Sequence, residues 1–233
     1  LLTVLAGLVV LPATAVAEPV DARVAALAEI ADGGLYVQER EPLLAMADSA
    51  LADLERIAAD PEIGWRARAA AAACRGWIAE PERYEAFFAA EPTMTRAGLP
   101  RYRKGEPEVD RDLLPLLVEM LLWTEQDPMK KLAVVDLLKR MKDPASVDAL
   151  GWALGHDGSL AVRRAAVEAL ERATDPRATG LLLDARQGDG IAEIRGAAAA
   201  ALGWRKEPAA LPALLRTLTR DEDVNCRARS AQS

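Results

Sequence analysis

The side chains that most often carry out chemistry in proteins are scarce and scattered in this sequence. Its 233 residues contain one histidine, His156, and two cysteines, Cys74 and Cys226. A structural zinc site takes about four such ligands at close spacing, and a nucleophilic relay needs a histidine with an acid fixed beside it. These residues supply neither arrangement. We therefore predict no metal site, no cofactor and no catalytic residue, and we expect the protein not to be an enzyme.

A group of basic residues could serve in recognition. Arg101, Arg103 and Lys104 surround Tyr102 without an intervening acid, in a chain whose net charge is −7. Such a group could bind an acidic partner. Glutamates flank it on both sides, however, and a solvated loop is the more ordinary interpretation. The negative net charge argues against nucleic acid as a partner, because binding to nucleic acid depends on neutralising phosphates.

The first 17 residues, LLTVLAGLVVLPATAVA, are uncharged and end in small residues around Val16. An apolar run followed by a small-x-small pattern is typical of a signal peptide and its cleavage site. We predict export to the periplasm or the medium, with cleavage after Ala17 and no membrane attachment afterwards. The alternative is an N-terminal membrane anchor, although the run is shorter than the ~20 residues needed to span a bilayer and Pro12 interrupts it.

The remaining sequence repeats itself. DPASVDALGWALGHDGSLAVRRAAVEAL, residues 143–170, returns in modified form 32 residues later, and the same offset aligns Pro144, Pro176 and Pro208. A fixed period between about 20 and 50 residues indicates a repeat array. The hydrophobic fraction of 51% is rich in alanine while aromatic residues make up only 4%, which favours helices over strands. We predict an all-α superhelix of about five to six antiparallel helix pairs.

Each repeat is expected to contain two helices. An acid followed by proline caps the start of the first helix, because the carboxylate accepts free backbone N–H groups and proline lacks the donor that would be unsatisfied there. A turn with glycine and aspartate ends that helix. The second helix is predicted to begin near Leu160 and Ala192, where apolar residues recur at helical spacing.

This pattern of Asp-Pro, turn aspartate and Val-Arg in the second helix resembles HEAT-like repeats, including the short bacterial form and that of phycobilin lyases. The resemblance covers residues 125–233. It implies that each turn aspartate and a basic residue six positions later belong to a ladder between neighbouring repeats. This role is structural, and an exposed pair of this kind contributes about 0.2–1 kcal/mol. The ladder positions are Asp60, Arg66, Glu125, Lys131, Asp157, Arg163, Asp189, Arg195, Asp221 and Arg227.

The resemblance extends to helical-repeat hydroxylases, which need several His-Glu pairs that are missing from this sequence. No residue pattern marks the chromophore pocket of a lyase. Fold alone does not fix function, so neither activity is carried over.

We expect one continuous domain over residues 18–233. An earlier repeat is predicted at 43–78, with Leu44, Leu51, Leu54 and Ile57 on one face of its first helix. It is preceded by a helix at 20–31 that Gly33-Gly34 ends. An irregular loop spans 89–110 and regular repeats span 111–233. Because the pattern reaches the last residue without the polar cap of a closed array, we expect the array to continue beyond it.

The outward face of the second helices is the surface that such arrays use for binding. It carries Arg164, Arg172 and Trp204, with Asp136 and Gly196 at related positions. A tryptophan is a common anchor in interfaces, although packing on the next repeat is the more usual fate of an aromatic side chain. The leading hypothesis is an exported scaffold that binds a protein or peptide on its concave face. The alternative is a subunit or domain of a larger enzyme, in which the repeats position a catalytic partner.

Overall fold

A computed structural model describes residues 19–30, 33–89, 111–124, 127–206, 208–212 and 214–215. Within these ranges the chain is helical and contains no strand, which confirms the predicted all-α class. The α-helices are α1 (Val20–Glu29), α2 (Gly33–Leu44), α3 (Asp48–Ala59), α4 (Trp65–Ala79), α5 (Pro81–Ala89), α6 (Leu114–Glu119), α7 (Pro128–Met141), α8 (Ser146–His156), α9 (Leu160–Arg172), α10 (Arg177–Gly188) and α11 (Ala192–Arg205). The shorter elements are the 3₁₀ turns η1 (Arg111–Leu113) and η3 (Pro208–Ala210) and the π-helical η2 (Met120–Thr124).

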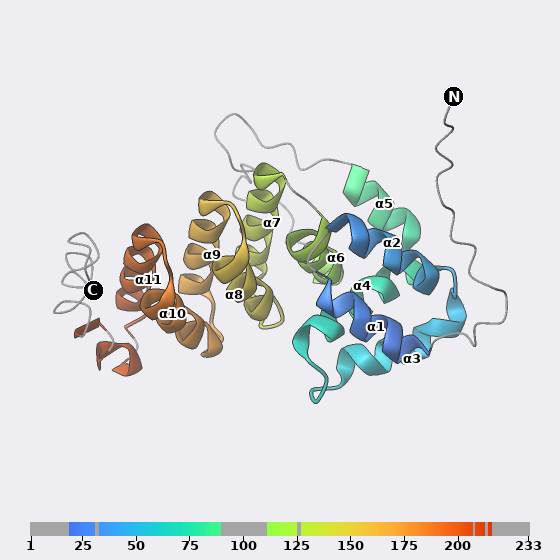
Figure 1. Ribbon diagram of the computed structural model, residues 1–233, viewed down its shortest axis with the longest axis horizontal. Helices are drawn as coiled ribbons and strands as arrows, with labels where there is room; N and C mark the ends of the chain where they lie inside the picture. Colours follow the sequence, from blue (N-terminus) through green and yellow to red (C-terminus); the bar gives the residue numbers. More distant parts are fainter. Residues whose placement is uncertain are drawn as a thin grey trace, which may run out of the picture.

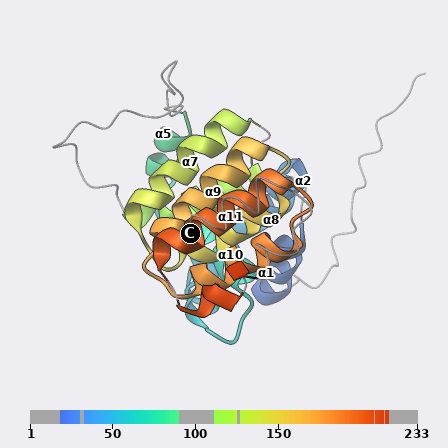
Figure 2. The ribbon, with the colours of Figure 1, turned by 90° about the vertical axis from the view of Figure 1, so that its left-hand side faces the viewer.

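The helices from α7 onward form a regular stack. α8 packs on α9 and α10 packs on α11, so that each repeat is a helix pair, as predicted. The second helices α7, α9 and α11 lie side by side in one layer, and the first helices α8 and α10 lie in another (Figure 2). This stack extends from a second group of helices, α1 to α6, which occupies the other end of the molecule (Figure 1).

The acids of the predicted acid-proline pairs lie just before the N-caps of the first helices rather than at them. Asp143 and Asp175 each accept a hydrogen bond from the backbone N–H two residues later, at 2.9 and 2.8 Å. The N-cap residues of α8 and α10 are Ala145 and Pro176, and neither makes a side-chain cap bond, so the predicted capping by these acids is wrong. Asp127, which was not among the predicted caps, is the N-cap of α7 and accepts the Met129 backbone N–H at 2.8 Å. The predicted acids therefore shape the turns that lead into α8 and α10.

Alanine determines how closely the helices approach. α11 buries Ala198, Ala199 and Ala201, and α4 buries an equivalent run around Cys74. A methyl group excludes water from the contact without holding the two helices apart. The resulting hydrophobic core is continuous through both groups of helices.

The N-terminal group differs from the prediction in two places. Gly33 and Gly34 do not end the first helix, because α1 ends at Glu29 and Gly33 is the first residue of α2. Leu44 belongs to the end of α2 rather than to the first helix of the 43–78 repeat. A turn separates α2 from α3, and in it Ala47 adopts a positive φ of 46°. Residues 1–17, most of the predicted loop at 89–110 and residues 216–233 lie outside the described ranges.

Candidate partner-binding surfaces

The predicted ladder positions meet between neighbouring repeats. Lys131 Nζ lies 2.8 Å from Asp157 Oδ2, and Arg163 forms an ion pair with Asp189 Oδ2 in the next repeat. The other oxygen of each aspartate accepts a backbone N–H of its own turn, 2.8 Å from Ser159 N in the first case. One carboxylate thus shapes its own turn and contacts the preceding repeat.

These ion pairs are more buried than the exposed pairs that the sequence led us to expect. The side chains of Asp157 and Asp189 are each 4% exposed, and that of Arg163 is 13% exposed. Arg163 Nε also donates to the Leu154 carbonyl at 2.7 Å. Separating such a pair costs more than separating a surface pair, because the charge left behind is poorly solvated.

The earlier and later ladder positions have other surroundings. Arg66 donates to the Ile30 carbonyl at 3.0 Å, and its guanidinium lies 5.8 and 5.7 Å from the ring centres of Trp123 and Trp152. Asp60 accepts the backbone N–H of Glu62. Arg195 donates to the Asp189 carbonyl at 3.0 Å. The remaining positions, Glu125, Asp221 and Arg227, lie outside the described residues.

The outer surface of α7, α9 and α11, here called the second-helix surface, carries the candidate binding residues. Arg164 on α9 pairs with Glu193 on α11 at 2.9 Å. Arg172 is exposed, and Trp204, one repeat later at the same position, is 74% exposed. Asp136 and Gly196 are buried rather than part of this surface. Trp204 is thus displayed at the end of α11 instead of being packed against described residues.

A buried polar cluster that no sequence pattern indicated joins the N-terminal helices. Glu119 is fully buried; it is paired with Arg40 and accepts the Trp77 indole N–H at 2.7 Å. Burial raises the pKa of Glu119, while Arg40 and the bond from Trp77 act against that rise. Tyr36 stacks on the indole of Trp123 with ring centres 4.6 Å apart. Trp77 is half-buried and the other members are buried, so the cluster holds α2 and α4 to α6 and η2.

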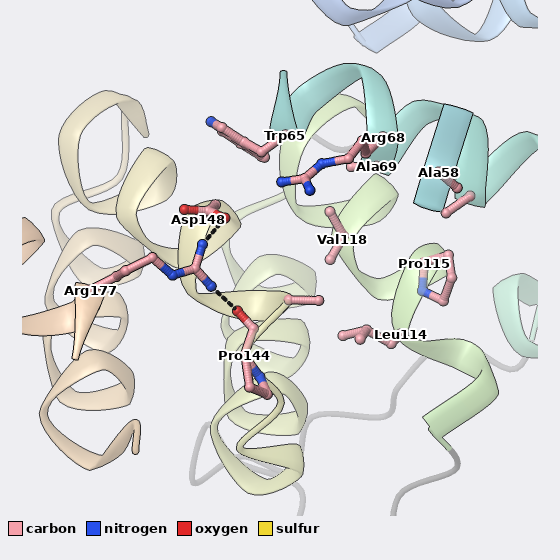
Figure 3. Close-up of a pocket in the computed structure, with 12 residues that line it drawn as sticks. Ala58, Trp65, Arg68, Ala69, Leu114, Pro115, Val118, Pro144, Asp148 and Arg177 are labelled. Atoms are coloured by element: carbon pink, nitrogen blue, oxygen red, sulfur yellow. Dashed lines mark hydrogen bonds and ion pairs between the residues drawn. The ribbon is translucent and has the colours of Figure 1, made fainter. Parts of the chain in front are cut away.

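A cleft opens between the N-terminal helices and the first helices of the regular repeats (Figure 3). Its volume is about 330 Å³. α4 and α6 supply one side, and the starts of α8 and α10 supply the other. The lining residues are Ala58, Trp65, Arg68, Ala69, Ala72, Leu114, Pro115, Val118, Pro144, Ala145, Asp148 and Arg177.

Arg177 is held firmly at one edge of the cleft. Its guanidinium lies 2.6 Å from Asp148 Oδ2 and 2.8 Å from both Asp175 Oδ2 and the Pro144 carbonyl. Hydrogen bonds from Arg177 lower the pKa of Asp175. The bonds to Asp148 and Pro144 also connect the starts of α8 and α10. No sequence signal distinguished this arginine, since it occupies an ordinary first-turn position.

The residues considered for chemistry are placed as follows. His156 ends α8, is exposed and stacks on Trp152 with ring centres 5.3 Å apart. Cys74 is a buried free thiol, and burial raises its pKa to about 12. Among the described residues, no group of three or more His, Cys, Asp and Glu side chains could hold a metal ion. Cys226 and the basic residues Arg101, Tyr102, Arg103 and Lys104 lie outside the described ranges.

Comparison with known proteins places these features in a family. The family model described as HEAT repeats matches residues 114–192 and, overlapping them, 161–233. No curated protein sequence gives a match. Among solved structures, human deoxyhypusine hydroxylase in complex with glycerol is similar over 90% of this chain and 82% of its own, with a TM-score of 0.50 and 20% sequence identity. At this identity the likeness concerns the fold alone. With more than half of its residues matched by the family model, this chain belongs to the HEAT repeat family.

Proposed function

We propose that this protein is a non-enzymatic scaffold that binds a partner protein on its second-helix surface. HEAT repeats generally mediate interactions between proteins. The observation that carries the proposal is the 74% exposure of Trp204 on a regular, well-packed helix. Tryptophan is enriched among the residues that dominate binding energies, and an exposed indole gains the most when a partner covers it.

The neighbouring positions support a partner with acidic and apolar groups. Arg140 and Arg172 occupy the position of Trp204 in the two preceding repeats and are exposed. Along the stacked ends of α7, α9 and α11, the surface thus presents the guanidinium of Arg140, which is paired with Asp136 at 2.9 Å, then that of Arg172, and then an indole. Arginine and tryptophan together favour a partner that offers carboxylates beside an apolar side chain.

Site-specific photo-crosslinking tests the proposal. A benzoylphenylalanine at position 204 should form a crosslink to one protein in the cells that express this chain. The same group at position 180 should not, because Gly180 is exposed on α10 in the opposite layer. Equal crosslinking at both positions would contradict a specific second-helix surface.

A stability measurement separates binding from packing at the same residue. Because Trp204 is mostly exposed, Trp204→Ala should change the free energy of unfolding by less than about 0.5 kcal/mol while abolishing capture of the crosslinked partner. A loss of about 2 kcal/mol or more would instead identify Trp204 as a packing residue and remove the basis of the proposal.

A partner with catalytic activity would favour the alternative function, in which the repeats hold an enzyme. Identification of the crosslinked protein by mass spectrometry decides between the two functions. Sequence supports a non-catalytic role for this chain, because one histidine and two cysteines offer few groups for metal or nucleophilic chemistry.

We also propose that the protein is exported. The support is the uncharged segment before Glu18 and its small-residue ending. Within the described ranges, no helix has the length and apolar character needed to cross a bilayer. N-terminal sequencing of the product tests export: a start at Glu18 is expected, and retention of the first 17 residues would contradict cleavage.

A further inference from the structure

The cleft between α4, α6, α8 and α10 contains one positive charge that no described group neutralises. Its charged lining residues are Arg68, Arg177 and Asp148. Arg177 is already paired with Asp148 and with Asp175. The Arg68 guanidinium forms no hydrogen bond or ion pair with any residue that the structure describes, although its side chain is half-buried. The charges of the lining side chains therefore sum to +1, in a chain whose overall charge is −7.

The position of Arg68 directs that charge into the cleft. Figure 3 shows its guanidinium extending from α4 into the space that faces Asp148 and Val118. Arginine stays ionised at every physiological pH, so the group cannot avoid the cost of burial by losing a proton. A carboxylate can accept two parallel hydrogen bonds from one guanidinium, and this geometry gives both strength and orientation.

The remaining walls are apolar. Val118, Leu114 and Pro115 come from α6, and the indole of Trp65 lies at the start of α4. Alanines of α3 and α4, and Ala145 directly before α8, line the space between them, and their small side chains leave it open. A volume of about 330 Å³ lies at the lower end of the range for ligand sites, enough for a few side chains. The ligand that matches these walls joins one carboxylate to an apolar group.

We propose that the cleft binds an acidic peptide segment of a partner protein. Arg68 holds one Asp or Glu carboxylate, and a neighbouring aliphatic side chain of the peptide packs against Trp65 and Val118. Arg177, fixed by Asp148 and Asp175, forms a rigid edge whose charge these carboxylates neutralise. The inference rests on the proposed scaffold function only in taking a polypeptide as the ligand, because this cleft is separate from the second-helix surface.

Fluorescence anisotropy of the full chain tests the cleft with defined probes. The probe is a labelled decapeptide in which Glu and Leu alternate, compared with peptides in which Gln or Lys replaces Glu. We expect saturable binding of the Glu-Leu peptide and weaker binding of the other two. Because the protein is acidic overall, attraction by net charge would give the opposite order and favour the Lys-Leu peptide. That opposite order would overturn the proposal.

Substitutions locate the binding. Arg68→Gln should weaken binding of the Glu-Leu peptide by about tenfold to a hundredfold, as expected for a hydrogen bond to a charged group. Arg75→Gln is the matched control, since it makes the same charge change on an exposed arginine of the same helix that does not line the cleft, and it should leave the affinity within about twofold. Ala145→Leu narrows the cleft from an exposed position without touching Arg68, so it should weaken binding in a chain whose thermal midpoint is unchanged.

Three further results would overturn the proposal. The first is an equal loss of affinity in Arg68→Gln and Arg75→Gln, and the second is no binding of the Glu-Leu peptide to the wild-type chain. The third is binding of hexanoate that depends on Arg68 without any binding of the peptide, which would assign the cleft to a small acid. None of these results affects crosslinking at position 204, so failure here is distinguishable from failure of the scaffold proposal.

Discussion

Replacing Arg163 tests whether burial makes the ladder a major source of stability. The side chains of Arg163 and Asp189 are 13% and 4% exposed, whereas those of the adjacent pair, Arg164 and Glu193, are 54% and 41% exposed. Both pairs connect the same two repeats. A comparison of the two therefore isolates the effect of burial from that of position.

The expected magnitudes differ between the two pairs. Arg163→Met leaves Asp189 buried without its cation and should cost about 3 kcal/mol, at the lower end for a broken buried pair because Asp189 keeps its bond from Ile191 N. Removing both charges in Arg163→Met with Asp189→Asn should cost only about 1–2 kcal/mol, from the loss of two hydrogen bonds. Asp189→Asn alone should cost about 1 kcal/mol, because Arg163 keeps its bond to the Leu154 carbonyl. The coupling energy is then about 2–3 kcal/mol, against about 0.2–1 kcal/mol for the exposed pair.

Urea unfolding of the single and double variants of each pair provides the measurement, with free energies taken by linear extrapolation. Arg163→Lys should recover most of the loss, because Lys131 already makes the corresponding contact to Asp157 at 2.8 Å. Coupling energies that agree within about 0.4 kcal/mol between the two pairs would refute the argument from burial.

Three further predictions concern other residues. Gly76→Ala should destabilise the fold by about 1–3 kcal/mol in thermal or urea unfolding, because a Cβ there would overlap the Tyr84 ring; an unchanged midpoint would contradict this packing. Because Cys74 is buried and its pKa is raised to about 12, it should react with iodoacetamide only after the protein unfolds. Mass spectrometry of the peptide that contains Cys74 measures this reaction, and labelling of the native chain would contradict the prediction. Arg177 lowers the pKa of Asp175 below its ordinary value of 3.8, so the Asp175 carboxylate binds a proton less tightly in the folded state than in the unfolded state. The stabilisation that this pair provides above pH 3.8 should therefore be lost as the pH falls through the lowered pKa. Asp175→Asn should reduce the difference between urea midpoints at about pH 5 and pH 3, and an unaltered difference would exclude this carboxylate as the cause.

The regular half of the fold could be predicted because its signals are local. The Asp-Pro pairs shape the turns directly before α8 and α10, and the starts predicted near Leu160 and Ala192 are the starts of α9 and α11. The 32-residue period then indicates which helices pack against each other. The same reasoning failed at Gly33, because a glycine pair marks a helix end only when no tertiary contact favours a new helix there.

The candidate sites were less accessible to sequence reasoning because they depend on contacts between distant residues. Arg68 and Arg177 are 109 positions apart in the sequence, yet both line one cleft. Nothing in the order of residues indicates that Arg177 has carboxylate partners while Arg68 has none among the described groups. The exposure of Trp204 likewise could not be separated from packing, since both are compatible with its place in the repeat.

The two oxygens of the turn aspartates have a consequence for how an array of this type changes length. In both Asp157 and Asp189, one carboxylate oxygen accepts a backbone N–H of its own turn and the other contacts the basic residue of the preceding repeat. Successive junctions between repeats are therefore held by the same contact. A duplicated copy of residues 143–174, inserted after residue 174, would offer its own aspartate to Arg163 and its own arginine to Asp189. Arrays of this type can therefore gain or lose whole 32-residue repeats while keeping every ladder contact. An insertion of any other length would move the turn aspartate of one repeat away from the basic residue of the preceding repeat.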